Sequence, residues 1–298
     1  MSWLRRMQDT SPVSARVATP ADRPVLAALL ANTWRRFGAL AVEEQLALLG
    51  NGRSVLAFEA YEATGFLGLA LRTPTGDPPE RWADVTMLAI AANQGAGRTT
   101  RLLLETALAA LQTEAVTGLT CVAAYRWVSE ALAEAHFDQI DQVINYARPA
   151  GKTPPAPSPT PATLRPAGPA DLTAIHGLNA AAFEPFWCYD PQTIASWLLT
   201  AEHAVMAELD GRPIGFALTT QAFSGEYAQL MRVATHPHFR GRGVGRQLVA
   251  DAIRFTQESG LPGLSLNTQA SNVISRYLYE SLGFHLTGAA VAVMVLRT

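Results

Sequence analysis

Residues 235–249 read THPHFRGRGVGRQLV. The stretch follows a run that favours a β-strand, residues 227–235, and leads into apolar spacing typical of a helix, residues 244–259. Its three glycines permit positive φ angles and let a ligand come close to the backbone. Successive amides at a helix N-terminus, aided by the helix dipole, bind anions. The stretch therefore predicts a strand–turn–helix unit that can bind a phosphate group.

The charged residues around this turn are all positive. Residues 227–250 contain Arg232, Arg240, Arg242 and Arg246 and no Asp or Glu, whereas the whole chain carries a net charge of −2. A Walker loop would require Gly-Lys-Ser/Thr after the glycines, and none follows here. A dinucleotide-binding fold would show an acidic residue on a following strand, and none is found. Glycine-rich turns and surface arginines also occur without any ligand, so from these residues alone both interpretations stay open.

Composition limits the alternatives. With 298 residues, 49% hydrophobic and 16% charged, the chain is expected to fold into two domains or one large one. The small net charge gives no reason to expect nucleic acid or an anionic membrane as a partner. Cys121 and Cys188 show neither metal-ligand nor disulfide-framework spacing, so no metal is expected. The same cysteine usage predicts a cytoplasmic protein, and without a long apolar run neither a membrane span nor an export signal is expected.

The chain contains an internal repeat. RVATPAD at 16–22 recurs as RPAGPAD at 165–171, and other pairs follow at similar offsets. Between the copies lies a proline-rich stretch that cannot join a helix interior or a central strand. The predicted organisation is one unit at 1–147, a linker at 148–163 and a second unit at 164–298.

Apolar spacing and turn residues predict a mixed α/β fold for the second unit. Asp210-Gly211 indicates a tight hairpin between two strands. The expected helices cover residues 171–183, a segment around 194–198, 244–259 and 272–282, and the later expected strands cover 227–235, 264–268 and 284–296.

Two motifs in this unit resemble signatures of the GNAT N-acetyltransferase superfamily. Arg240, Gly243 and Gly245 fit its acyl-CoA-binding pattern RxxGxG, and NVISRYLYESLGF at 272–284 fits its second signature. The resemblance implies two tandem GNAT-like domains of mixed α/β type, a layout similar to that of mycothiol synthases. It also implies acetyl-CoA as cosubstrate and direct transfer of acetyl to a primary amine of a small molecule or peptide.

The resemblance further implies positions for the cosubstrate. The backbone of Val233 and Thr235 would bind the pantetheine arm, and Asn272 would contact that arm or cap its own helix. The pyrophosphate would lie on the turn and its arginines, namely Arg240, Gly241, Arg242, Gly243, Val244, Gly245 and Arg246.

Catalysis would need an acid and a base. Tyr279 matches the acid that protonates the departing thiolate, although a tyrosine on an amphipathic helix can also be a core residue. Glu226 is the nearest carboxylate for the base and can equally be a hairpin residue. Glu184, Asp190, His236 and His238 are alternatives, and Cys188 is expected to be a packing residue.

The first unit lacks these features. Its loop before Gly95 is shorter, nothing corresponds to Arg240, and Ala133 aligns with Tyr279. A degenerate domain is therefore expected there. A non-catalytic acyl-CoA-binding or regulatory module is the alternative function. The acceptor and the oligomeric state do not follow from the sequence, although nearby aromatic residues suggest an apolar acceptor pocket (Phe183, Phe186, Trp187, Tyr189 and Phe223).

Overall fold

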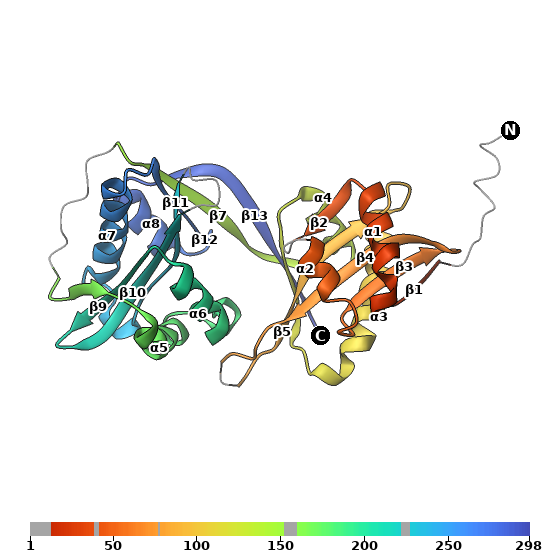
Figure 1. Cartoon of the computed structure of the whole chain (residues 1–298), viewed down its shortest axis with the longest axis horizontal. Helices are drawn as coiled ribbons and strands as arrows, with labels where there is room; N and C mark the ends of the chain where they lie inside the picture. Colours follow the sequence, from red (N-terminus) through yellow and green to blue (C-terminus); the bar gives the residue numbers. More distant parts are fainter. Residues whose placement is uncertain (1–12, 39–41, 77, 152–159, 222–226) are drawn as a thin grey trace. The chain divides into compact units, whose positions relative to one another are not determined.

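The computed structural model describes residues 13–38, 42–76, 78–151, 160–221 and 227–298. The chain divides into two compact units. Unit 1 is drawn from Met1–Arg72, Arg81–Asp141 and Val291–Thr298, and unit 2 from Thr73–Glu80 and Gln142–Ala290. Both units combine helices with a mixed sheet, which confirms the predicted α/β class (Figure 1). No helix in the described part of the chain is long and apolar enough to cross a membrane.

Unit 1 contains a sheet in the order β1-β3-β4-β5-β6-β13, with β2 beside β5. β5 and β6 are parallel, and the other pairs are antiparallel. The elements are β1 (Val13–Val17), η2 (Pro20–Asp22), α1 (Arg23–Asn32), β2 (Arg35–Gly38), α2 (Val42–Ala47), β3 (Ser54–Glu59), β4 (Glu62–Leu71), β5 (Trp82–Ile90), α3 (Ala96–Leu111), η3 (Gln112–Glu114), β6 (Gly118–Ala123) and α4 (Arg126–Glu134).

Unit 2 repeats this pattern in the order β8-β9-β10-β11-β12-β7, with β11 and β12 parallel. The elements are β7 (Asp138–Pro149), β8 (Thr163–Pro166), η4 (Pro169–Asp171), α5 (Leu172–Ala182), η5 (Pro185–Trp187), α6 (Pro191–Thr200), β9 (His203–Leu209), β10 (Arg212–Gln221), β11 (Ala228–Thr235), η6 (Pro237–Phe239), α7 (Val244–Glu258), β12 (Gly263–Gln269), α8 (Val273–Ser281) and β13 (His285–Arg297). The expected hairpin is confirmed, because Asp210 and Gly211 both adopt positive φ between β9 and β10.

The last strand of each sequence copy pairs in the sheet built mainly by the other copy. β7 precedes the proline-rich stretch, yet its residues Val143–Pro149 pair with β12. β13 ends the second copy, yet its residues Ala292–Arg297 pair with β6. The two units therefore do not coincide with the two halves of the sequence.

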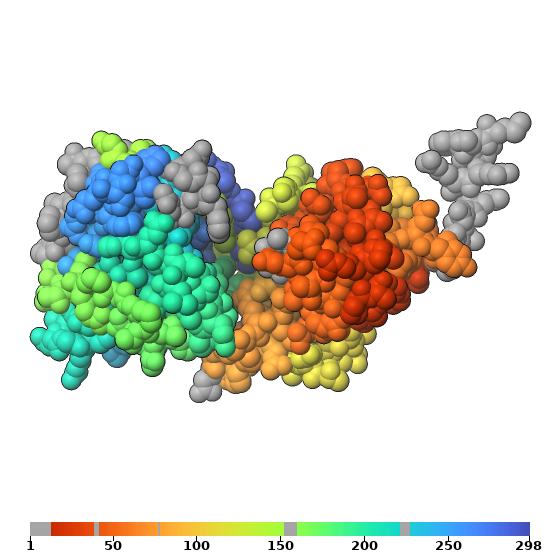
Figure 2. Space-filling view, viewed as in Figure 1, coloured from red at the N-terminus to blue at the C-terminus, as the bar shows by residue number. Residues whose placement is uncertain are grey.

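The core of unit 2 has two layers. On one face of its sheet, α7 contributes Leu248 and Ile253 to a buried cluster that also contains Tyr279 of α8. On the other face, Ile175 of α5 and Ile194 of α6 pack on β9 and β10. In Figure 2, much of the visible surface of this unit is formed by these covering helices, α5 and α6 in green and α7 in blue.

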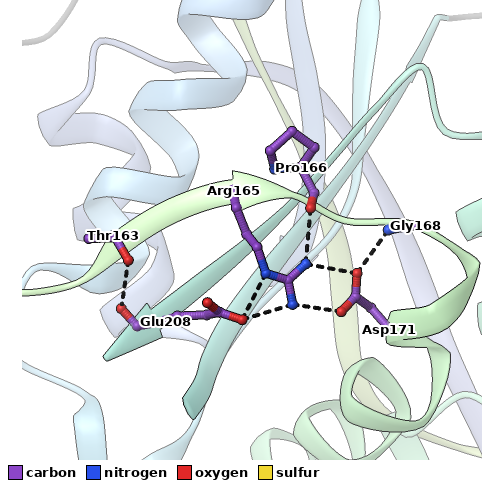
Figure 3. A network of polar contacts seen from close by, with 6 residues as sticks. All are labelled: Thr163, Arg165, Pro166, Gly168, Asp171 and Glu208. Atoms are coloured by element: carbon purple, nitrogen blue, oxygen red, sulfur yellow. Dashed lines mark hydrogen bonds and ion pairs between the residues drawn. The ribbon is translucent and has the colours of Figure 1, made fainter. Parts of the chain in front are cut away.

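The repeated heptapeptide forms the same structure in both units. In unit 2, the Arg165 guanidinium donates two hydrogen bonds to Asp171 at 2.9 and 2.7 Å and a third to Glu208 at 2.8 Å (Figure 3). In unit 1, Arg16 makes the same paired contact with Asp22 at 2.7 and 2.6 Å. These contacts hold the pKa of both carboxyls below the ordinary value. The repeat thus reflects a shared structural contact, not a site of chemistry.

Deleting residues 291–298 is expected to destabilise unit 1 by roughly 5 kcal/mol, because Val293, Met294 and Val295 are almost fully buried and each such side chain contributes about 1.5–3 kcal/mol. Urea unfolding followed by circular dichroism measures the change. Met294→Leu conserves volume and should cost less than about 1.5 kcal/mol. An unchanged unfolding curve after the deletion would contradict the pairing of β13 with β6.

Candidate functional site

Unit 2 contains a cavity of about 660 Å³. Its wall combines the second half of β11, the turn into α7, the end of β12, one side of α8 and the segment after α5. The lining residues are Ala182, Phe183, Trp187, Tyr189, Leu230, Met231, Arg232, Val233, Ala234, Thr235, Phe239, Arg240, Gly241, Gly243, Val244, Gly245, Arg246, Leu266, Asn267, Thr268, Gln269, Asn272, Ile274, Ser275, Leu278 and Tyr279.

One wall is a strand edge opened by divergence of two parallel strands. Among the described residues, β12 pairs with β11 only along Ala228–Leu230. Beyond Leu230 the strands separate, and Val233 and Thr235 line the cavity. A ligand with amide groups can therefore hydrogen-bond to this backbone as an additional strand would.

The glycine turn forms the second wall. Gly241 and Gly243 have φ angles of +74° and +81°, which only glycine adopts readily. Gly243 is the N-cap of α7 and has no side chain to accept from the first helical amides. These amides point out of the helix end and can bind an anion. Gly241, Gly243 and Gly245 all line the cavity.

The arginines of the turn separate into two groups. Arg240 and Arg246 line the cavity, where Arg240 donates to the Ala182 carbonyl at 2.7 Å and Arg246 to Ser281 Oγ at 2.8 Å. Arg242 lies over the Phe239 ring at 5.4 Å and is not part of the described lining. The cavity is therefore cationic, although only part of the predicted cluster contributes.

Tyr279, on α8, also lines the cavity. Its side chain is 6% exposed and packs beside the rings of Tyr146 and Phe284. Burial raises the pKa of the phenol to about 12, against opposing effects of a Ser275 hydrogen bond and the Arg232 charge. At neutral pH the phenol is protonated and can donate a hydrogen bond into the cavity.

Strand β7 holds the helix that carries Tyr279. The Tyr146 hydroxyl donates to Glu280 Oε1 at 2.6 Å, and Arg148 Nε donates to the Leu282 carbonyl at 2.9 Å. Both β7 residues are almost fully buried. Because β7 belongs to the first sequence copy, that copy supplies part of the support for α8. The spacing of residues within either copy does not reveal this.

Asn272 lies at the start of α8. Its Oδ1 accepts from the Ser275 amide at 3.1 Å, so it caps the helix, and it also lines the cavity. In this position Asn272 can cap α8 and also contact a ligand in the cavity, the two roles that the sequence left open.

The candidate bases that the structure describes are not part of the cavity lining. Glu226 lies outside the described residues. Asp190 caps α6, accepting from the Gln192 and Thr193 amides at 2.9 and 3.0 Å. Glu184, His236 and His238 are not part of the lining, and the described lining contains neither a carboxylate nor a histidine.

Cys188 has the packing environment expected of it. Its Sγ lies 3.1 Å from Asn179 Nδ2, which donates to it, and burial raises the pKa of the thiol. A raised pKa disfavours the thiolate, which is the nucleophilic form of cysteine. No group of His, Cys, Asp and Glu suited to a metal ion occurs among the described residues.

The equivalent region of unit 1 is filled by the chain itself. β6 pairs with β5 only along Trp82–Asp84, but β2 pairs with Met87–Ile90 beyond the divergence. Gly95, the N-cap of α3, has a φ of −70°, unlike Gly243. The Glu134 side chain occupies the space where a Cβ on Gly97 would lie. The part of unit 1 that the structure describes thus has neither the open strand edge nor the uncovered helix end of unit 2.

Comparison with known proteins agrees with this geometry. Residues 172–284 match the model of the Acetyltransferase (GNAT) family. The chain is 31% identical to mycothiol acetyltransferase of Tsukamurella paurometabola over 162 residues, which cover 48% of this chain and 55% of that protein. It is 38% identical over 76 residues to the [ribosomal protein bS18]-alanine N-acetyltransferase of Salmonella typhimurium, covering 26% of this chain and 50% of that enzyme. The chain thus spans about half the length of these curated relatives.

Solved structures resemble nearly the whole chain. A GCN5-related N-acetyltransferase from Sphaerobacter thermophilus has a TM-score of 0.63 at 20% identity and covers 97% of both chains. A tandem GNAT protein from the clavulanic acid biosynthesis pathway has a TM-score of 0.59 at 15% identity and covers 96% of this chain and 98% of that one. At these identities the likeness concerns the fold, and it extends over both units.

Proposed function

We propose that unit 2 transfers an acetyl group from acetyl-CoA to a primary amine, because residues 172–284 match the GNAT acetyltransferase family model and the fold resembles that of a tandem GNAT protein. The observation that carries the proposal is one cavity that joins an uncovered helix N-terminus, an open strand edge and a buried phenol. A long thioester with a diphosphate at one end would contact these three features in turn: the helix end with its diphosphate, the strand edge with its arm and the phenol with its sulfur.

The residues present fit such a ligand. The amides of the turn at Gly241–Gly245, with Arg240 and Arg246, would hold the diphosphate, because the described lining has no carboxylate to repel it. The backbone of Val233 and Thr235 would bind the amide-bearing arm and aim the thioester towards Tyr279. Arg242 and Val244 contribute through their backbone in this proposal, and Asn272 contacts the arm while it caps α8.

Tyr279 would donate a proton to the sulfur as the C–S bond breaks, and Glu226 would remove the ammonium proton, directly or through water, before the amine nitrogen bonds to the acetyl carbon. Positioned acids and bases each accelerate such steps by about 10²- to 10⁴-fold. The amine nitrogen would lose its second proton as the tetrahedral intermediate collapses, and that proton would restore the Tyr279 phenol through water. Glu226 would release the first proton to bulk water after the products leave. The relatives include a mycothiol acetyltransferase and a [ribosomal protein bS18]-alanine N-acetyltransferase, so a small-molecule or peptide amine is proposed as acceptor.

The proposal is tested by following release of free CoA from the full-length protein with acetyl-CoA and a panel of primary amines. Acetylated product from at least one amine supports it. A non-catalytic acyl-CoA-binding module is the second candidate, favoured by the lack of a carboxylate or histidine in the described lining. Tight acetyl-CoA binding without turnover of any amine would favour that module.

We expect one acetyl-CoA site per chain. In unit 1, pairing of β2 with β5 and the position of Glu134 support exclusion of the ligand from the equivalent region. Isothermal titration calorimetry of the full-length protein should give a stoichiometry near one. Two equivalent sites would show that unit 1 is not degenerate in this respect.

A further inference from the structure

A β-bulge determines where Arg232 points. In the pairing of β10 with β11, Leu218 faces Arg232 and Thr219 faces Leu230, so Met231 is an extra residue on β11. Leu230 packs with α7, whereas Ala234, four residues later, packs with α5 and α6. In a regular strand these two would share one face. The bulge therefore turns Arg232 towards α5 and into the cavity.

The described residues that contact the Arg232 guanidinium are neutral. It lies over the Phe183 ring at 3.4 Å and the Tyr189 ring at 4.6 Å. Its Nε donates to Asn179 Oδ1 at 3.0 Å and its Nη2 to the Trp187 carbonyl at 2.8 Å. Among the described residues no carboxylate forms an ion pair with it, although Arg16, Arg72 and Arg165 each have one.

Such a charge needs a counter-ion from elsewhere. Burial lowers the pKa of Arg232 to about 10, which still leaves the group cationic at neutral pH. Partial withdrawal of a cation from water without an anion is costly, and a bound anion offsets that cost. The hydrogen bonds to Asn179 and Trp187 fix the guanidinium plane, leaving its outer edge, formed by Nη1 and Nη2, to pair with a planar anion.

Along β11, Arg232 comes before the glycine turn that is proposed to hold the diphosphate. Three residues, Val233–Thr235, follow Arg232 on β11, so its Cα lies about 10 Å from the strand end that leads into the turn, at roughly 3.3 Å per residue. Its charge does reach Tyr279, since each affects the pKa of the other. Arg232 therefore lies at the reactive end of the proposed thioester, among the aromatic side chains on the acceptor side.

We propose that Arg232 binds a carboxylate on the acceptor, so that the acceptor class is an amine bearing a carboxylate, such as an amino acid. This inference rests on the proposed function and adds the acceptor's charge. The aromatic rings beside the guanidinium would pack against the acceptor's apolar part, while the pairing of carboxylate and guanidinium orients the amine towards the thioester.

The test compares each amino acid of a panel with its primary amide, which keeps the amine and side chain but lacks the negative charge. With saturating acetyl-CoA, the full-length protein should show kcat/KM values about 10- to 100-fold higher for the acid, as expected for a charge-assisted hydrogen-bonded pair. Arg232→Gln should abolish this preference, mainly through KM, and Arg232→Lys should retain part of it. Arg212→Gln, on the exposed start of β10, is the matched control and should leave the preference intact.

Two results would overturn the proposal. One is an amide that is acetylated as well as its acid by the wild-type protein. The other is an Arg232→Gln variant that loses the same factor of kcat with acids and amides, which would point to polarisation of the thioester carbonyl. If no amine is turned over, calorimetric binding of acids and amides to the protein loaded with CoA gives the same comparison. Failure to bind acetyl-CoA, measured separately, would instead contradict the proposed function.

Discussion

Replacing Tyr279 by phenylalanine is expected to lower kcat by about 10²- to 10⁴-fold and to leave acetyl-CoA affinity nearly unchanged, because only the proton donor is removed. The ring remains to pack against Tyr146 and Phe284. Steady-state kinetics with the best amine of the panel, together with calorimetry, separate the two effects. Full activity of Tyr279→Phe would remove the phenol from the mechanism.

The same helix supplies the control. Tyr277 is two residues away, is 70% exposed and is not part of the described lining, so Tyr277→Phe should retain wild-type kcat.

The pH profile of kcat gives a second check on the role of Tyr279. The pKa of Tyr279, about 12, lies above the ordinary tyrosine value of about 10, so the acid form persists as pH rises from about 7 to about 10. Over that range kcat should not fall through loss of this proton.

Features that depend on local backbone chemistry could be predicted from the sequence. The turn before α7 needs positive φ at Gly241 and Gly243, and glycine reports this requirement directly. The helix that carries Tyr279 has an Asn cap at its start and a positive-φ glycine, Gly283, just beyond its end. Because these signals are short-range, the sequence alone places the glycine turn and Tyr279 in the same unit.

Features that depend on long-range pairing could not be predicted. The sequence analysis predicts the strand at 284–296, which is β13, but not β7, and it does not say which strand either one pairs with. The direction of Arg232 depends on a bulge at Met231, which reverses the alternation of side chains halfway along β11. The sequence consequently groups Arg232 with the arginines of the turn, whereas the structure places it beside the rings of Phe183 and Tyr189.

Replacing Gly243 by valine is expected to weaken acetyl-CoA binding by about 100-fold, which corresponds to about 2.8 kcal/mol. A β-branched residue at a φ of +81° is strongly disfavoured, so the backbone will relax towards negative φ. That relaxation rotates the first amides of α7 away from the cavity. Restoring their direction for the diphosphate costs about 1–3 kcal/mol of backbone strain, in addition to weakened hydrogen bonds. Calorimetry with acetyl-CoA measures the loss.

The other end of α7 provides the comparison that makes this result specific. Gly260 follows the C-cap with a φ of +67°, has no heavy atom near its would-be Cβ and is not part of the described lining. Gly260→Val therefore imposes a similar strain on the same helix without moving the N-terminal amides. Both variants should lose comparable thermal stability, but only Gly243→Val should lose affinity. Equal affinities in the two variants would mean that the diphosphate does not bind at the start of α7, and the cavity would then need a different ligand.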